Sequence, residues 1–389
     1  MKGWLAFRKN GYLRSGKVGF ADNRSHDKMM ENKKKKVIIA IDSFKGCLTS
    51  AEANAAASRA FDDREYDVST FSVSDGGDGM LDAFANAWNA KTIEVPTHDA
   101  LMRHRTGNIA IAGDTAIIEV AQSVGLSFIE PEQRNPLVAT SYGVGELIAE
   151  ALHRCCKHLI IGLGGTATSD CGIGMLHALI DRMTHSGNID DLKLDGVDVT
   201  LATDVGNPLL GSDGAASVFG PQKGASPEMV FQLEHRAETF SRLSAKHCGR
   251  DESKTAGAGA AGGLGYAFLQ FFDARIISGA DLLFSQLNFD KKLEGCDLVI
   301  TGEGSADRQT LMGKLPQKVL EHASKSADNP VVWLIAGKTE DEDELREAGF
   351  TRVININEFL KDGEDPMDKD IARRNIEQSV ASRIRFERF

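Results

Sequence analysis

Four segments of the sequence combine glycines with a carboxylate or a lysine, the residue types that bind phosphate groups and divalent cations. They lie at residues 42–46 (DSFKG), 74–79 (SDGGDG), 164–174 (GGTATSDCGIG) and 302–314 (GEGSADRQTLMGK). Glycines let backbone N–H groups approach an anion, carboxylates hold Mg²⁺, and a lysine neutralises a phosphoryl group. Because Gly and Asp also form ordinary turns, one such segment would be weak evidence, and their repetition is what predicts phosphoryl transfer.

A fifth glycine-rich segment, residues 204–224 (DVGNPLLGSDGAASVFGPQKG), contains Asp204 and Lys223. Its pattern favours a functional and a structural role about equally. The two charged side chains would suit the same chemistry, since phosphoryl transfer depends on positioning and charge neutralisation more than on covalent catalysis.

Five short apolar runs indicate the elements of the fold, and the first four of them lead into the segments at 42–46, 74–79, 164–174 and 302–314. The runs are VIIAID (37–42), VSTFSV (68–73), LIIGLGG (159–165), LVITGEG (298–304) and VVWLIAG (331–337). Runs of this kind are typical of strands buried on both faces of a parallel sheet. Helical patterns lie between them, for example a capping box at Thr49 and Glu52 and an apolar helical face within residues 144–152.

This alternation predicts an α/β fold with a doubly wound, Rossmann-like parallel sheet. In such a sheet ligands bind outside the carboxyl ends of the strands, where the polar segments lie. Residues 80–134 and 186–284 interrupt the alternation, and we interpret them as a second α/β domain inserted into the first. The Rossmann-like domain would then consist of residues 35–79, 135–185 and 285–389.

Residues 1–34 lack a clear periodicity and are basic, and we expect a disordered or artefactual extension there. Met29 and Met30 stand just before the first apolar run, which favours a translation start at that point. A basic regulatory tail is the alternative interpretation.

Composition excludes several classes of partner. The formal net charge of −11 disfavours nucleic acid and anionic membranes, which a basic surface would have to meet. The six cysteines form no CxxC pair and no spacing with histidine that would suit zinc or a disulfide framework. No apolar run reaches the roughly 18 residues that cross a bilayer, so we expect a cytoplasmic protein.

Two stretches that resemble nucleotide-binding motifs lack the flanking residues that these motifs require. Gly257, Gly259 and Gly262 match GxGxxG, but the preceding residues are polar and do not form the strand that the dinucleotide fingerprint requires. A nicotinamide dehydrogenase is therefore disfavoured. Gly313 and Lys314 are not part of a Walker sequence either, so an ATP site must have another design. The ten histidines show no catalytic spacing.

Taken together, the segments resemble the type-1 glycerate kinase family from about Lys36 to Gly337. Eight stretches carry the resemblance in the right order: DSFKG (42–46), DGGDG (75–79), IIEVAQSVGL (117–126), NP with TSYGVGELI (135–148), GLGGTATSDCGIGML (162–176), NPLLG with GPQKGA (207–225), GAGAAGGLGYA (257–267) and TGEGSADRQTLMGK (301–314). The resemblance implies ATP- and Mg²⁺-dependent phosphorylation of D-glycerate, usually to 2-phosphoglycerate, in organic acid catabolism. It also implies an active site in a cleft between two domains. Glycerate and ATP would be the partners, without nucleic acid or membrane, and a homodimer is left open.

On this basis each polar residue receives an expected role. The residues expected to act in catalysis are Lys45, Asp170, Asp204 and Glu303. Those expected to bind substrate or nucleotide are Ser43, Gly76, Gly77, Asp78, Gly164, Gly165, Thr166, Lys223, Asp307 and Lys314. Those expected to bind the metal are Asp75 and Glu303. Asp170 is the first choice for the base that takes the substrate proton, and Asp204 is the second. Lys45 would neutralise a phosphate or the glycerate carboxylate. Lys223 and Lys314 would bind ATP phosphates as point charges.

The sequence departs from the family pattern at a few positions. Ser305 and Ala306 stand where the family usually has Arg and Ile, and Arg308 is a candidate to replace the missing cation. Asp78 and Ser169 stand where Glu and Asn are common. Two rivals therefore stay open: a kinase of a related small hydroxy acid, and a nucleotide-binding sensor that has lost catalysis.

Overall fold

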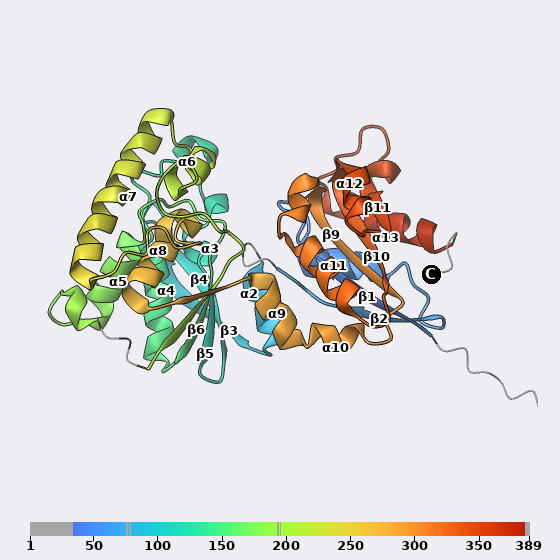
Figure 1. Cartoon of the computed structure of the whole chain (residues 1–389), viewed down its shortest axis with the longest axis horizontal. Helices are drawn as coiled ribbons and strands as arrows, with labels where there is room; N and C mark the ends of the chain where they lie inside the picture. The colour runs from blue at the N-terminus through green and yellow to red at the C-terminus, as the bar shows by residue number, and fades with distance from the viewer. Residues whose placement is uncertain (1–33, 75–76, 78, 193, 195, 386–389) are drawn as a thin grey trace, which may run out of the picture. The chain divides into compact units, whose positions relative to one another are not determined.

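Four of the five apolar runs form strands of one all-parallel sheet. In sheet order its strands are β11 (Arg352–Asn355), β10 (Val331–Thr339), β9 (Leu298–Ala306), β1 (Lys35–Ile41) and β2 (Tyr66–Thr70). In Figure 1 the blue strands β1 and β2 lie beside the orange β9 and β10, although they are far apart in the sequence. The computed structural model describes residues 34–385 except 75, 76, 78, 193 and 195.

Helices on both faces of this sheet explain why its strands are apolar throughout. Val37, Ile39 and Ile41 of β1 pack in one cluster with α1 (Ser50–Ser58) and α13 (Lys369–Ile384). Ile38 and Ala40 face the opposite side, in a cluster with α9 (Gly279–Leu287), α10 (Phe289–Leu293) and α11 (Leu315–Lys325). The predicted capping box at Thr49 and Glu52 begins α1 and is confirmed.

The strand order places the polar loops at one point. Counted along the chain, the five strands have the order 2-1-3-4-5, which reverses between β1 and β9. Ligands bind at such a switch point, outside the carboxyl ends of the strands. Ile41 of β1 pairs with Gly302 of β9, so Asp42 and Glu303 follow on neighbouring strands.

A second, mixed sheet contains the strands β3 (Lys91–His98), β4 (His104–Ala112), β5 (Thr115–Glu119), β6 (His158–Gly162), β7 (Asp198–Ala202) and β8 (Arg275–Ile277), in that order. The pairs β3–β4 and β4–β5 are antiparallel, and the remaining pairs are parallel. Its helices are α3 (Ala121–Val124), α4 (Tyr142–His153), α5 (Ile173–Met183), α6 (Ala215–Phe219), α7 (Pro227–Cys248) and α8 (Ala260–Phe272). An α/β fold with a parallel sheet and a second α/β sheet region is thus confirmed.

The sheet membership of residues 135–185 differs from the sequence-based assignment. They were expected in the Rossmann-like domain, but β6 pairs with β5 and β7 in the six-stranded sheet. The run 159–165 is as apolar as the strands of the first sheet, so its pattern predicts a buried strand without indicating its neighbours. Where the domain borders lie stays a prediction. Residues 1–33, which include Met29, Met30 and all but the last residue of the expected extension 1–34, lie outside the described residues.

Two connecting helices belong to the core that both sheets share. α2 (Met80–Ala87) and α9 pack in a cluster that contains Ile38 of the first sheet and Ile160 of the second. The N–H group of Leu81, in the first turn of α2, donates to the buried Glu119 carboxylate at 2.9 Å. α12 (Glu342–Glu347) connects β10 to β11. Within the described part of the chain, no helix has the length and hydropathy for crossing a bilayer.

Candidate active site

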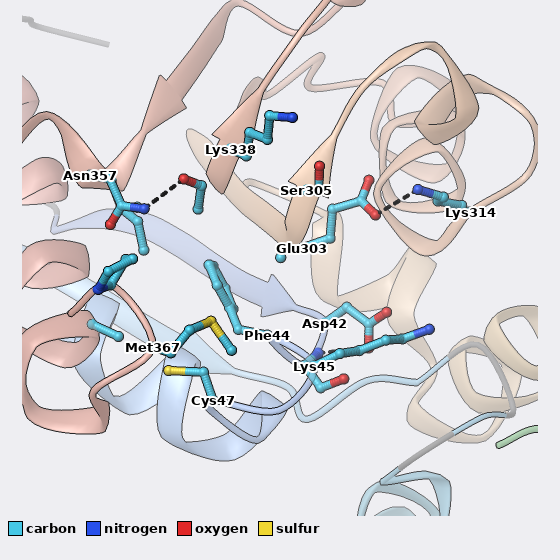
Figure 2. Close-up of a pocket in the computed structure, with 16 residues that line it drawn as sticks. Asp42, Phe44, Lys45, Cys47, Glu303, Ser305, Lys314, Lys338, Asn357 and Met367 are labelled. Carbon is cyan, nitrogen blue, oxygen red and sulfur yellow. Dashed lines mark hydrogen bonds and ion pairs between the residues drawn. The ribbon is translucent and has the colours of Figure 1, made fainter. Parts of the chain in front are cut away.

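A cavity of about 490 Å³ lies at the switch point of the parallel sheet (Figure 2). We call it the switch-point pocket. Its polar lining consists of Asp42, Ser43, Lys45, Glu303, Ser305, Lys314, Lys338 and Asn357, and its apolar lining of Phe44, Cys47, Ile356, Pro366, Met367 and Ala372, with Gly304 and Gly337 between them. Asp42, Ser43 and Lys45 follow β1, while Glu303, Ser305 and Lys338 lie at the carboxyl-terminal ends of β9 and β10, the edge of the sheet at which ligands bind.

The acidic wall of this pocket is held by short polar contacts. Glu303 accepts a hydrogen bond from Thr310 Oγ1 at 2.6 Å and from Lys314 Nζ at 3.1 Å. Burial raises the pKa of Glu303, and its contacts with Thr310 and Lys314 oppose that shift. In Figure 2 the side chains of Asp42, Lys45 and Glu303 extend toward the side of the pocket on which Lys314 lies. Lys45 is exposed and has no hydrogen-bond partner among the described residues.

The opposite part of the pocket is apolar. The ring of Phe44 and the side chain of Met367 face the same space in Figure 2. Asn357 lies at the rim, and its Nδ2 donates to the Gly337 carbonyl at 2.8 Å. A flat, largely apolar group could lie between these side chains, with its polar end toward Asn357.

A second cavity of about 400 Å³, which we call the acceptor pocket, adjoins the first. It is lined by the polar residues Lys45, Thr166, Thr203, Asp204, Gln222, Lys223 and Lys314, by Gly77, Gly164, Gly165 and Gly313, and by Leu126, Leu163, Val205, Phe219, Ala261 and Met312. Lys45 and Lys314 line both cavities. The side chains of Lys45 and Lys314 therefore lie where a ligand in one pocket would meet a ligand in the other.

Most of the predicted site residues line one of the two pockets. The switch-point pocket contains Ser43, Lys45, Glu303 and Lys314, and the acceptor pocket contains Gly77, Gly164, Gly165, Thr166, Asp204 and Lys223 together with the two shared lysines. Asp75, Gly76 and Asp78 lie outside the described residues. Asp170 and Asp307 line neither pocket.

The Asp170 carboxylate is surrounded by hydrogen-bond donors of the protein itself. It accepts hydrogen bonds from Ser141 N and Oγ at 2.8 and 2.9 Å and from the N–H groups of Gly172 and Gly174 at 3.1 Å each. These donors include the first turn of α5, where a carboxylate also suits the helix dipole. Asp170 lines a separate cavity with His177 and Arg236. It is therefore poorly placed to serve as the base that the sequence favoured.

The side chains of Asp307 and Arg308 also form their hydrogen bonds outside the two pockets. Asp307 is the N-cap of a 3₁₀ helix (Arg308–Leu311), and its carboxylate accepts from Gln309 N at 2.7 Å. Arg308 Nε donates to Glu344 at 2.7 Å, so this guanidinium does not supply the cation that the family has near Ser305.

Replacing Asp170 by Asn should lower stability more than turnover. One oxygen would become an NH₂ group facing backbone donors, which costs about 1–3 kcal/mol. We expect a lower midpoint of urea unfolding, measured against Asp181→Asn, whose exposed carboxylate accepts only the Tyr142 hydroxyl in the described contacts, at 3.0 Å. A stable Asp170→Asn protein with a collapsed kcat would return the role of base to Asp170.

Several lining residues escaped the sequence reasoning. Lys338 directly follows the run 331–337, and inspection of that strand end would have found it. Phe44 lies inside DSFKG but is apolar, so a search for charged groups passed over it. Asn357 and Met367 follow β11 and its loop, where no strand had been predicted.

Comparison with known proteins gives one consistent result. The model of a family described as the glycerate kinase family matches residues 37–386. The glycerate kinase of Haemophilus influenzae is 37% identical over 361 residues, which cover 85% of this chain and 95% of the relative. The glycerate 2-kinase of Escherichia coli is 35% identical over 344 residues, covering 82% and 90%. A crystal structure of a Salmonella typhimurium LT2 protein assigned as glycerate kinase 2 matches with a TM-score of 0.73 and 33% identity, covering 90% of this chain and 98% of the other.

Proposed function

Because the chain belongs to the glycerate kinase family, we propose that it phosphorylates D-glycerate with ATP, giving 2-phosphoglycerate in organic acid catabolism. The observation that carries the proposal is the pair of adjoining cavities that share Lys45 and Lys314. Phosphoryl transfer needs a donor and an acceptor site with cations between them. The expected cytoplasmic location and homodimer remain predictions.

We assign the nucleotide to the switch-point pocket. The apolar part around Phe44 and Met367 suits a purine ring, and the lysines at the other side suit its phosphates. Ser43 and Gly304 also line this pocket. The acid then occupies the acceptor pocket, beside Asp204 and the glycine-rich turn at Gly164 and Gly165.

The transfer step follows from this arrangement. The glycerate hydroxyl oxygen attacks the γ-phosphorus, the bond from that phosphorus to the bridging oxygen breaks, and ADP leaves with the electron pair. Asp204 receives the hydroxyl proton. Lys45 and Lys314 neutralise the charge on the transferring group, and Glu303 holds Lys314 in place.

The residues present fit a Mg²⁺ ion bound in part by the nucleotide. Mg²⁺ is usually held by one or two protein carboxylates together with phosphates and waters. Asp42 and Glu303 offer two carboxylates on neighbouring strands, whereas no group of three or more acidic, His or Cys ligands occurs among the described residues. The ion would supply charge neutralisation at the phosphates. Asp75 and Asp78, the other predicted ligands, lie outside the described residues.

A coupled assay of ADP release with Mg-ATP and D-glycerate, with phosphorus NMR of the product, tests the proposal. Glycerate-dependent turnover and a 2-phospho signal would support it, and a 3-phospho signal would change the pose but not the class. Turnover with tartronate, lactate or erythronate in preference to glycerate would favour a related hydroxy acid kinase. ATP binding without turnover of any acid would favour a nucleotide-binding sensor that has lost catalysis, the alternative suggested by Ser305.

Met367→Ala tests the placement of the nucleotide. Met367 is 52% exposed, so its truncation should not disturb the fold. Loss of one apolar wall should cost about 1 kcal/mol of binding, or about a five-fold rise in the KM for ATP, without changing the KM for glycerate. Met102→Ala, with 47% exposure and outside both pockets, is the matched control. A selective rise in the KM for glycerate would exchange the two pocket assignments.

A further inference from the structure

Lys223 is a buried cation that forms no ion pair with any carboxylate among the described residues. Its side chain lines the acceptor pocket, yet the residue is only 3% exposed. Its Nζ donates to Thr166 Oγ1 at 3.2 Å and to the Thr168 carbonyl at 2.6 Å, and both acceptors are neutral. No carboxylate forms an ion pair with it among the described residues. Buried charges in proteins are normally paired, so this ammonium group lacks an expected partner.

The surrounding backbone fixes the position of this group. A Cβ atom on Gly262 would lie 1.9 Å from the Thr168 carbonyl oxygen and 3.0 Å from Lys223 Nζ, so α8 packs directly against the lysine and its acceptor. An ammonium group has three donors, and the two contacts leave one N–H. Because Lys223 lines the acceptor pocket, an anion bound there can reach the remaining donor.

We infer that Lys223 binds the carboxylate of the acceptor hydroxy acid and so selects acids over neutral polyols. The inference rests on the proposed function and revises the expectation that Lys223 binds ATP phosphates. Lys45 and Lys314 line both pockets and can meet phosphates, whereas Lys223 lines the acceptor pocket alone. A carboxylate bound there would give the buried ammonium a counter-charge in direct contact, which none of the described residues provides.

The protonation of Lys223 gives a second signature. Burial lowers its pKa to about 8, and the charge of Asp170 opposes the shift. The other charged groups that line its pocket are Asp204, Lys45 and Lys314. Below this pKa the lysine is an ammonium and attracts a carboxylate, and above it the lysine is neutral. The kcat/KM for glycerate, which reports the free enzyme, should therefore fall as the pH rises through about 8.

The test compares D-glycerate with its neutral amide, glyceramide, in the full-length chain and in Lys223→Met. The variant should raise the KM for glycerate on the order of 10²- to 10³-fold, lose the preference for acid over amide and lose the alkaline fall in kcat/KM. The KM for ATP should stay within about two-fold of the original, as loss of one ligand contact should not affect the other ligand. Lys246→Met, an exposed lysine in the last turn of α7, should change none of these values.

Three outcomes separate this inference from the proposed function. A rise in the KM for ATP with an unchanged acid-to-amide preference overturns the inference and leaves the kinase intact. If the original protein has no glycerate-dependent turnover, calorimetric titration with D-glycerate still decides: binding that Lys223→Met abolishes supports the inference, and binding that persists overturns it. If Lys223→Met does not fold, the pH profile of the unaltered protein is decisive, and an alkaline limb that is the same for acid and amide overturns the inference.

Discussion

Asp204→Asn is expected to reduce kcat by about 10²- to 10⁴-fold while leaving the fold intact. Asp204 lies two residues beyond the end of β7, lines the acceptor pocket and is exposed, so an isosteric amide should not disturb packing. An amide cannot take up the hydroxyl proton at neutral pH. The measurement is steady-state kinetics with D-glycerate and ATP, together with the midpoint of thermal unfolding.

The control for this prediction is Asp213→Asn, an exposed aspartate of the same glycine-rich segment that lines neither pocket. Its kinetics should match those of the unaltered protein. If Asp204→Asn raised only the KM for glycerate, Asp204 would be a binding residue and not the base.

Glu303→Gln should lower kcat by about 10²- to 10³-fold, because it removes the charge that holds a cation at the transferring group. The carboxylate now accepts from both Thr310 and Lys314. A glutamine is neutral, so its oxygen would offer Lys314 only an uncharged acceptor, while the Thr310 hydroxyl could turn to accept from the NH₂ group. Lys314 would lose its fixed position between the two pockets.

The pH dependence of Glu303 has a definite sign. Burial raises its folded-state pKa above the ordinary value, so the carboxylate is lost as the pH falls through this raised pKa. The acidic limb of the kcat/KM profile should therefore be shifted toward higher pH relative to that of an ordinary glutamate. For stability the sign is opposite: a raised folded-state pKa favours the native state at low pH, and this contribution is lost as the pH rises.

Glu303→Gln should accordingly unfold no earlier than the original protein at neutral pH, and its loss of activity would not reflect misfolding. Glu347→Gln, exposed at the end of α12, is the matched control and should leave kcat unchanged. An unchanged kcat in Glu303→Gln would remove Glu303 from the proposed transfer step.

The sequence predicted those parts of the site that depend on local patterns. The runs at 37–42 and 298–304 indicated buried strands, and the polar residues after them, such as Lys45 and Lys314, do line the cavities. Sequence patterns did not indicate which strands pair, because backbone hydrogen bonding is the same for any buried apolar strand. For that reason residues 135–185 were assigned to the other sheet.

The roles of the acidic residues show a second limit. Asp170 and Asp204 both belong to glycine-rich segments, and composition alone could not separate a helix-capping carboxylate from one that faces a cavity. Four hydrogen-bond donors around Asp170 make that distinction, and three of them lie on the adjacent helix or on Ser141, 29 positions away. The apolar residues Phe44 and Met367 were missed for a related reason, since an apolar residue facing a pocket resembles any core residue in the sequence.

The position of β1 beside β9 also has a consequence for biosynthesis. Lys36 N–H donates to the Asp297 carboxylate across 261 positions of sequence. During translation β1 therefore cannot pair with β9 until most of the chain has left the ribosome. The strands between residues 91 and 277 can already pair with one another by then. In that interval one edge of β1, which is apolar from Val37 to Ile41, has no partner, and such edges recruit other chains. The nascent protein would then be most prone to aggregate before β9 emerges, and it would depend on chaperones during that period.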